Sequence, residues 1–194
     1  MHGSNDDTSV CSPGQLRLAR RSTMRELCRA ERRYIVLYAS LKALHLLAIV
    51  AWIGGMFFMH FCLRPAAAEV LEPPARVRLL HATMRRFFAV VTVVIGIVVL
   101  SGAAMIGMAS HEATRSGLVF NMPLDWYTMV ALFVVMLFVF THIRLVLFRR
   151  LDAAVAAQAW PSAAAAITAI RWEVLINLVI GVFIIVVVRL GGTA

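Results

Sequence analysis

An uninterrupted apolar run over residues 43–62 constrains the fold of this chain more than any other feature. The run contains no Asp, Glu, Lys or Arg and carries a histidine near each end, His45 and His60. A stretch of about 20 such residues is long enough to cross the hydrocarbon core of a bilayer. The chain is therefore expected to be a membrane protein. An imidazole inside a membrane helix is costly enough to indicate a function.

Three further apolar runs follow the first, and together the four predict an all-α fold, an integral membrane four-helix bundle. Charged residues make up only 15% of the 194-residue chain, whereas a soluble domain carries about 25%. The four spans are expected at about residues 35–63, 87–109, 125–148 and 173–190. Between the last two, an Ala-rich stretch over residues 151–170 is expected to lie along the membrane surface as a helix broken at Trp160-Pro161.

The formal net charge of +9 comes from arginines at the margins of the spans, where anionic lipid headgroups favour them. Residues 1–33 are expected to form a basic tail that is disordered or lies at the interface, and residues 34–194 the membrane domain. The sequence offers no basic patch with base-reading groups on a soluble fold, which argues against a nucleic-acid partner. The three cysteines lack the spacing of a zinc site or a disulfide framework; they are Cys11, Cys28 and Cys62.

The orientation depends on where translation begins. The first and third connections lie on one side of the membrane and are rich in arginine, while the full N-terminal tail carries a comparable positive charge on the other side. If the chain starts at Met24, the side with the two connections carries the excess of positive charge. The positive-inside rule then places them in the cytoplasm, with both termini outside.

One face of the first span gathers polar and polarisable side chains. At 100° per residue, His45, Trp52, Met56 and Met59 fall within about 60° of one another. For the methionines and Trp52, ordinary helix packing is the simpler interpretation. For His45, a hydrogen bond between helices competes with ligation, because membrane bundles use such bonds.

Depth in the bilayer divides the candidate ligands into two zones. In the first, His45 lies level with Met105 and Met129 near one boundary. In the second, His60 lies level with His142 near the opposite boundary. The imidazoles of His45 and His142 differ in depth by about 15–20 Å at 1.5 Å per residue, so they are not expected to hold one iron between them.

Imidazole and thioether ligands suit copper(I) and haem iron, so a copper or haem b site is predicted in these zones. The spans lack the acidic residues that a hydrolase would need, and neither zone has the ligand set of a structural zinc site. The candidate metal ligands are His45, His60, His142, Met56, Met59 and Met105.

The run from Leu41 to Leu47, which includes Lys42-Ala43-Leu44-His45, is followed by Trp52-Ile53-Gly54-Gly55, Arg64-Pro65 and Thr141-His142-Ile143-Arg144. Over roughly residues 35–192 the chain resembles the copper-resistance D (CopD) family of bacterial inner-membrane proteins. The resemblance implies a multi-pass protein of the bacterial inner membrane that takes part in copper transport, delivery or resistance. Its expected partners are the lipid bilayer and either a periplasmic copper protein or a quinone, and the sequence leaves an oligomer open.

The Lys42-Ala43-Leu44-His45 opening is also similar to that of the related four-span membrane protoporphyrinogen oxidases, which bind haem b. That likeness implies His45 as a haem ligand. If haem is bound, we expect Met129 as its axial partner and Arg64 as a partner of the propionates. The lysine that characterises the start of the third span in that family is absent, since Trp126–Val130 occupies this region.

Three functions follow from these observations. The first is a CopD-like protein that handles copper through intramembrane His and Met residues. The second is a haem-b redox protein, which would be an oxidoreductase that either resembles the protoporphyrinogen oxidases or passes electrons to quinone. The third is a structural or assembly subunit without a cofactor.

Overall fold

The computed structural model describes residues 13–191, and within this range all secondary structure is helical. Four segments are long and apolar enough to cross a membrane. They are Glu31–Val70, Pro73–Arg115, Leu124–Ala156 and Trp160–Leu190. The predicted all-α membrane four-helix bundle is therefore confirmed.

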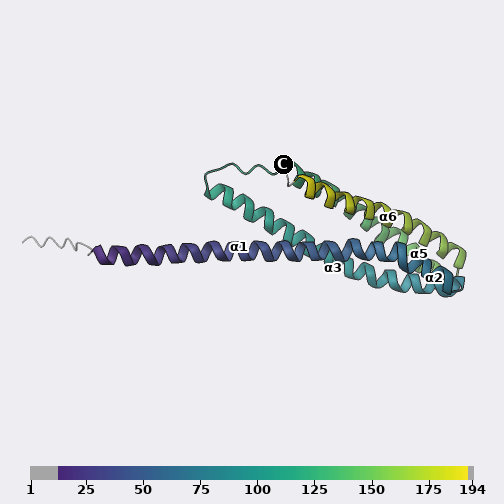
Figure 1. The fold of residues 1–194 in the computed structure, drawn as a ribbon. Helices are drawn as coiled ribbons and strands as arrows, with labels where there is room; N and C mark the ends of the chain where they lie inside the picture. The colour runs from purple at the N-terminus through teal and green to yellow at the C-terminus, as the bar shows by residue number, and fades with distance from the viewer. Residues whose placement is uncertain (1–12, 192–194) are drawn as a thin grey trace, which may run out of the picture.

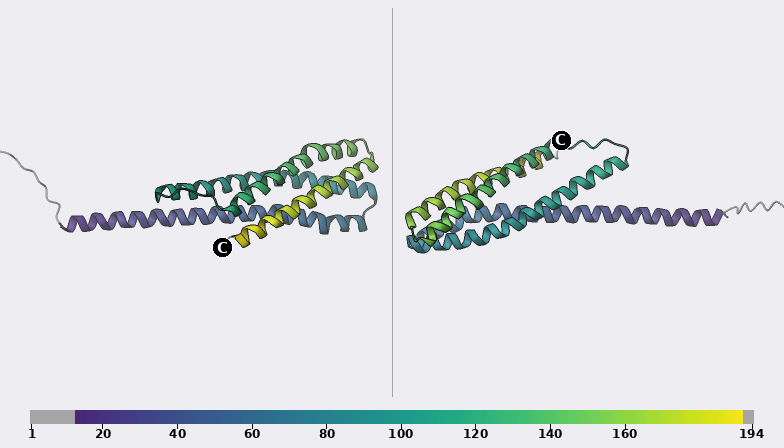
Figure 2. Two further views of the ribbon diagram at one scale, coloured as in Figure 1. Left: turned by 90° about the horizontal axis from the view of Figure 1, so that it is seen from above. Right: turned by 180° about the vertical axis from the view of Figure 1, so that it is seen from behind.

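The helices run alternately up and down, and both described ends of the chain lie toward the same end of the bundle (Figure 1). Helix α1 packs against α3 and α4 against α6, while α6 also contacts α1 and α3. Figure 2 shows these pairs converging at the end that holds α2 and α5. The elements are α1 (Pro13–Phe58), the π-helix η1 (Met59–Leu63), α2 (Arg64–Val70), α3 (Pro73–Arg115), α4 (Leu124–His142), the π-helix η2 (Ile143–Leu147), α5 (Phe148–Ala156) and α6 (Trp160–Gly191).

The predicted tail is described only in part. Residues 1–12 lie outside the described range. From Pro13 the chain is helical, and the first part of α1 projects beyond the other helices (Figure 1). The domain boundary near residue 33 stays a prediction.

The first helix does not end at Arg64-Pro65 as expected. The backbone passes through η1 into α2 and leaves helical geometry only at Leu71, which has φ −116° and ψ 137°. A proline inside a helix removes a hydrogen bond and clashes with the preceding turn. Pro65 escapes this conflict because it occupies the first turn of α2, directly after the wider π-turn.

The Ala-rich segment also differs from its prediction. The helix breaks at Ala157–Ala159, and α6 then starts at Trp160 and continues through the fourth span. Ala163 and Ile170 are completely buried in the bundle. One face of this stretch therefore packs in the bundle, and its second half is continuous with the fourth span instead of forming a separate helix.

Two helices end in Schellman motifs with a left-handed residue. After α3, Gly117 has φ 71°, and the Leu118 N–H donates to the Ala113 carbonyl at 2.9 Å. After α5, Gln158 has φ 52°, and the Ala159 N–H donates to the Ala154 carbonyl at 2.9 Å. The second motif thus uses a non-glycine residue where glycine is favoured.

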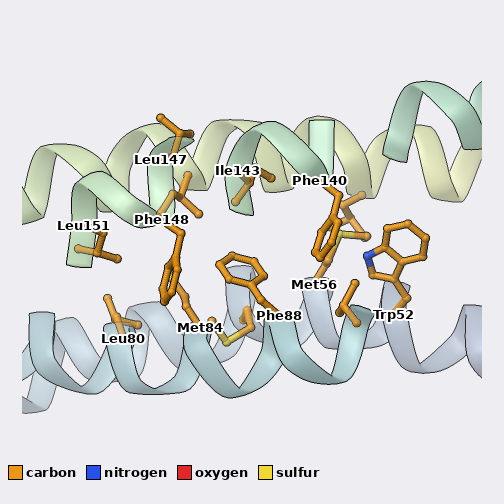
Figure 3. Close-up of a cluster of buried hydrophobic side chains, with 14 of the residues drawn as sticks. Trp52, Met56, Leu80, Met84, Phe88, Phe140, Ile143, Leu147, Phe148 and Leu151 are labelled. Atoms are coloured by element: carbon orange, nitrogen blue, oxygen red, sulfur yellow. The ribbon is translucent and has the colours of Figure 1, made fainter. Parts of the chain in front are cut away.

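The densest part of the core lies toward the end with α2 and α5. Figure 3 shows aromatic and methionine side chains interdigitating there from several helices. The Phe88 ring of α3 meets the Phe140 and Phe148 rings edge to face, with centroids 6.0 and 5.2 Å away. Trp52 of α1 continues the series by packing on Phe140 and Phe133.

The outer surface of the spans is strongly apolar. Leu100 is 73% exposed and Phe138 is 74% exposed. Extensive exposed apolar surface marks contact with a membrane or a partner. Together with the length of the helices, this surface identifies the lipid bilayer as the surroundings of the bundle.

Candidate functional site

His45 is a buried polar residue at the contact between α1 and α3. Its side chain is held by Ser101 of α3, with 2.8 Å between His45 Nδ1 and Ser101 Oγ. The next residue, Gly102, lies against the ring: a Cβ there would meet His45 Cε1 at 3.4 Å, an ordinary contact distance. Ser101 therefore anchors the imidazole, and Gly102 packs against it.

The surroundings of Ser101 indicate which nitrogen of His45 carries the proton. Ser101 Oγ lies 2.5 Å from the Ile97 carbonyl oxygen. A serine hydroxyl has one hydrogen to donate, and in a helix it commonly donates it to the carbonyl four residues earlier. Ser101 then accepts a hydrogen bond from the Nδ1–H of His45. In the neutral ring this leaves the lone pair of Nε2 free to bind a ligand.

A cavity of about 310 Å³ lies beside His45. Its walls come from α1, α3, α4 and α6, and among the lining side chains only the His45 imidazole and the Trp52 indole carry nitrogen. Ligand pockets typically have volumes of about 300–1,000 Å³ and mostly apolar walls. The cavity therefore has the size and character of a site for an apolar ligand that carries one coordinating or hydrogen-bonding group.

The rim of this cavity faces the lipid. Val99, Val134 and Ile185 line it and are also among the exposed apolar residues of the spans. The opening thus lies between helices on the outer surface of the bundle. It does not lead into a polar channel.

Of the two methionines predicted to lie level with His45, the structure brings one to the cavity. Met129 of α4 lines it, whereas Met105 of α3 does not. Met56 lies on the same helix as His45 but is packed in the hydrophobic core. The sequence could not separate Met129 from Met105, because both have a depth similar to that of His45, and it selected Met56 only through the helix face that Met56 shares with His45.

The other predicted zone contains a second, smaller hollow of about 20 Å³. Met59, His60 and Arg64 line it from one side, and Arg171 of α6 lines it from the other. His60 Nδ1 is buried and has no hydrogen-bond partner within the described part of the chain. Arg64 thus lies at this hollow and not at the cavity that His45 and Met129 share.

His142 shares neither hollow. Its side chain is 50% exposed, and Nδ1 lies 2.8 and 2.9 Å from the two carboxylate oxygens of Glu173 on α6. A similar pair joins His81 of α3 to Asp152 of α5 at 2.5 Å. These two pairs connect helices at the basic end of the bundle.

The sequence analysis missed both histidine–carboxylate pairs, because Asp152 lies outside the expected spans and Glu173 is only the first residue of the expected fourth span. It also missed the burial of Asn177, which is 1% exposed and donates from Nδ2 to the Met136 carbonyl at 3.2 Å. A polar side chain early in an apolar run was the available signal. Asn177 joins α6 to α4.

No group of three or more His, Cys, Asp or Glu side chains suited to a metal ion occurs among residues 13–191. Any metal bound there would depend on one or two imidazoles together with methionine sulfur. Such a set suits a soft ion such as copper(I) better than zinc.

Comparison with known proteins gives one match. A family model described as CopD, Copper resistance protein D, matches residues 81–190, which is more than half of the chain. The matched segment includes Ser101, Met129 and His142 and leaves out His45 and His60. No curated protein and no solved structure matches the chain.

Proposed function

The chain belongs to the copper resistance protein D family, and on this premise we propose that it handles copper within the membrane through the imidazole of His45. The observation that carries the proposal is a buried histidine whose Nδ1 is bonded to Ser101 beside a cavity that Met129 also lines. Membership of the family indicates copper as the metal, and the buried imidazole of His45 offers a ligand for it.

The chemistry of the donor atoms favours copper(I). Neutral imidazole and thioether are ligands that this ion accepts readily. A metal-binding histidine usually donates its other ring N–H to a neighbouring group, which fixes the ring and raises its basicity. Ser101 has this relation to His45. The cavity would then hold copper between Nε2 of His45 and the sulfur of Met129.

The position of His45 along α1 suits exchange of an ion with the water phase. It follows Lys42 by three residues, a rise of about 5 Å along the helix. The end of the bundle with the α3–α4 connection would then receive or release the metal. A soluble copper protein on that side is the expected partner, and the bacterial inner membrane is the expected location.

The test measures copper(I) bound by the detergent-purified protein and by the variants His45→Ala and His142→Ala. We expect the first variant to lose the bound copper and the second to keep it, because His142 lies outside the cavity. In parallel, a deletion strain should change in copper sensitivity and copper content. Unchanged values in the strain, with no copper on the pure protein, would refute the proposal and favour a subunit without a cofactor.

A second candidate, a haem-b protein, is favoured by the apolar cavity itself. His45 and Met129 come from different helices, and the remaining walls suit a porphyrin face. Haem iron accepts axial His and Met ligands. Arg64 follows His45 by 19 residues, about 28 Å along the helix, so it could not hold the propionates of the same porphyrin.

An optical spectrum distinguishes the two candidates. If haem is bound, a Soret band should appear after haem-replete expression, His45→Ala should abolish it and His60→Ala should alter it less. Absence of the band would exclude haem. A larger effect of His60→Ala than of His45→Ala on the band would indicate that haem binds at the other end of the bundle.

A further inference from the structure

The small hollow at the basic end of the bundle combines three nitrogen-rich side chains with apolar walls. His60, Arg64 and Arg171 line it together with residues such as Met84 and Phe88. His60 follows His45 by 15 residues on the first span, so the hollow lies about 22 Å from His45 along the helix. Anything bound there is separate from the cavity used in the proposed function.

In the described part of the chain, the two arginines at this hollow, Arg64 and Arg171, have no carboxylate within ion-pair distance. The charge of Arg171 acts on both His60 and Arg64, and that of Arg76 acts on Arg64 as well. The Arg171 guanidinium lies over the Trp172 ring, with 5.8 Å between Cζ and the ring centroid. Arg64 is partly buried, whereas Arg171 is exposed. A partly buried charge is costly unless it is paired, so an anion at the hollow would stabilise Arg64 in particular.

The π-helix η1 positions two of the three side chains. The Arg64 N–H donates to the Met59 carbonyl five residues earlier, which widens the turn that contains His60. Single π-turns inside α-helices are frequent at functional sites. Here the turn leaves His60 Nδ1 buried beside the hollow without a hydrogen-bond partner.

The size of the hollow limits what can enter it. A volume of about 20 Å³ is enough for one oxygen atom or one water molecule, since a water needs at least about 10–15 Å³. A whole organic anion would not fit inside. One oxygen of a larger anion would fit, with the rest of the anion at the surface near the arginines.

We propose that His60, Arg64 and Arg171 form a binding site for a phosphate group. One phosphate oxygen occupies the hollow and accepts a hydrogen bond from the ring N–H of His60, while the two guanidinium groups bind the remaining oxygens. Arginine matches phosphate through paired N–H donors. The ligand is either a phospholipid headgroup or free phosphate, and basic pockets between membrane helices are known to suit the former. The same positive charges disfavour a metal cation at His60.

The test uses the full-length protein in detergent, stripped of lipid. Native mass spectrometry measures the Kd for a short-chain phosphatidylglycerol with the wild type, R64Q/R171Q and the control R149Q/R150Q. The control removes two charges from exposed side chains of α5 that do not line the hollow. We expect the Kd to rise about tenfold or more in R64Q/R171Q, from the loss of charged hydrogen bonds. In the control it should change by about twofold or less.

A competition with inorganic phosphate identifies the source of the ligand. If free phosphate displaces the lipid, the phosphate group alone is recognised; if it does not, the phospholipid is the ligand. Wild-type binding by R64Q/R171Q, an equal loss in both pairs, or no binding by the wild type would each overturn the proposal. R171Q alone serves if the double variant fails to fold, because Arg171 is exposed, and helical circular dichroism checks each variant.

Discussion

His45 Nδ1 and Ser101 Oγ lie 2.8 Å apart and join α1 to α3 inside the apolar part of the bundle. The bond gives the buried imidazole a side-chain partner inside the apolar bundle, where an unsatisfied polar group is costly. It also fixes the orientation of the ring, so that Nε2 remains available. The same contact thus contributes to packing and prepares a ligand.

The first prediction concerns the Ser101→Ala variant. Without the hydroxyl, Nδ1 of His45 loses its acceptor, and the copper(I) affinity of the protein should fall about 10–100-fold, as for other outer-shell partners of metal ligands. A competition titration with a copper(I) chelator measures the affinity.

Ser110→Ala is the control for that change. The Ser110 hydroxyl donates to the Gly107 carbonyl of its own helix, at 3.0 Å, and Ser110 does not line the cavity, so loss of the hydroxyl should leave copper binding unchanged. Equal affinity of Ser101→Ala and wild type would show that Ser101 has only a packing role.

The second prediction compares two methionines at similar depth. Met129→Leu replaces the thioether that lines the cavity with a side chain of similar volume. The copper(I) affinity should therefore fall about tenfold or more through the loss of a soft ligand. Met105→Leu should have no such effect, because Met105 lies outside the cavity. The same chelator titration measures both, and a larger effect at Met105 would contradict the proposed site.

The third prediction concerns the adjacent glycines of α1. A Cβ on Gly55 would overlap the Phe87 ring, whereas one on Gly54 would meet no atom within 4 Å. Gly55→Ala should lower stability by about 1–3 kcal/mol through overpacking. Gly54→Ala should leave it unchanged or raise it by up to about 1 kcal/mol through helix propensity. Thermal unfolding in one detergent compares them, and similar melting temperatures would refute the close approach of α1 to α3.

The fourth prediction concerns the two Schellman motifs. Gln158→Gly should raise stability by about 1 kcal/mol, since a left-handed residue with a Cβ costs about 1–2 kcal/mol. Gly117→Ala should lower stability by about the same amount, because alanine is also disfavoured in the left-handed conformation. A Cβ at Gly117 would meet no atom within 4 Å, so no steric overlap adds to this cost. Opposite shifts of the melting temperature are expected. Shifts of the same sign would show that the backbone at these positions relaxes.

The sequence predicted the spans because hydropathy over about 20 residues reports directly on a membrane environment. It also predicted the shared depth of His45 and Met129, because helical rise is constant. It could not predict how each helix is rotated against its neighbours. His60 and His142 have similar depth, yet the structure pairs His142 with Glu173 and leaves His60 beside Arg64. That rotation follows from packing contacts such as those of Phe88 and Phe140, which hydropathy does not encode.

The lipid-facing rim of the larger cavity has a consequence for how its affinity is measured. A hydrophobic molecule reaches such an opening by sideways diffusion within the leaflet, so its concentration there depends on its oil–water partition coefficient. Two compounds that make identical contacts but partition differently will then show different apparent Kd values when the ligand concentration is expressed per volume of buffer. Dilution with extra lipid or detergent will weaken both, although neither the contacts nor the protein has changed.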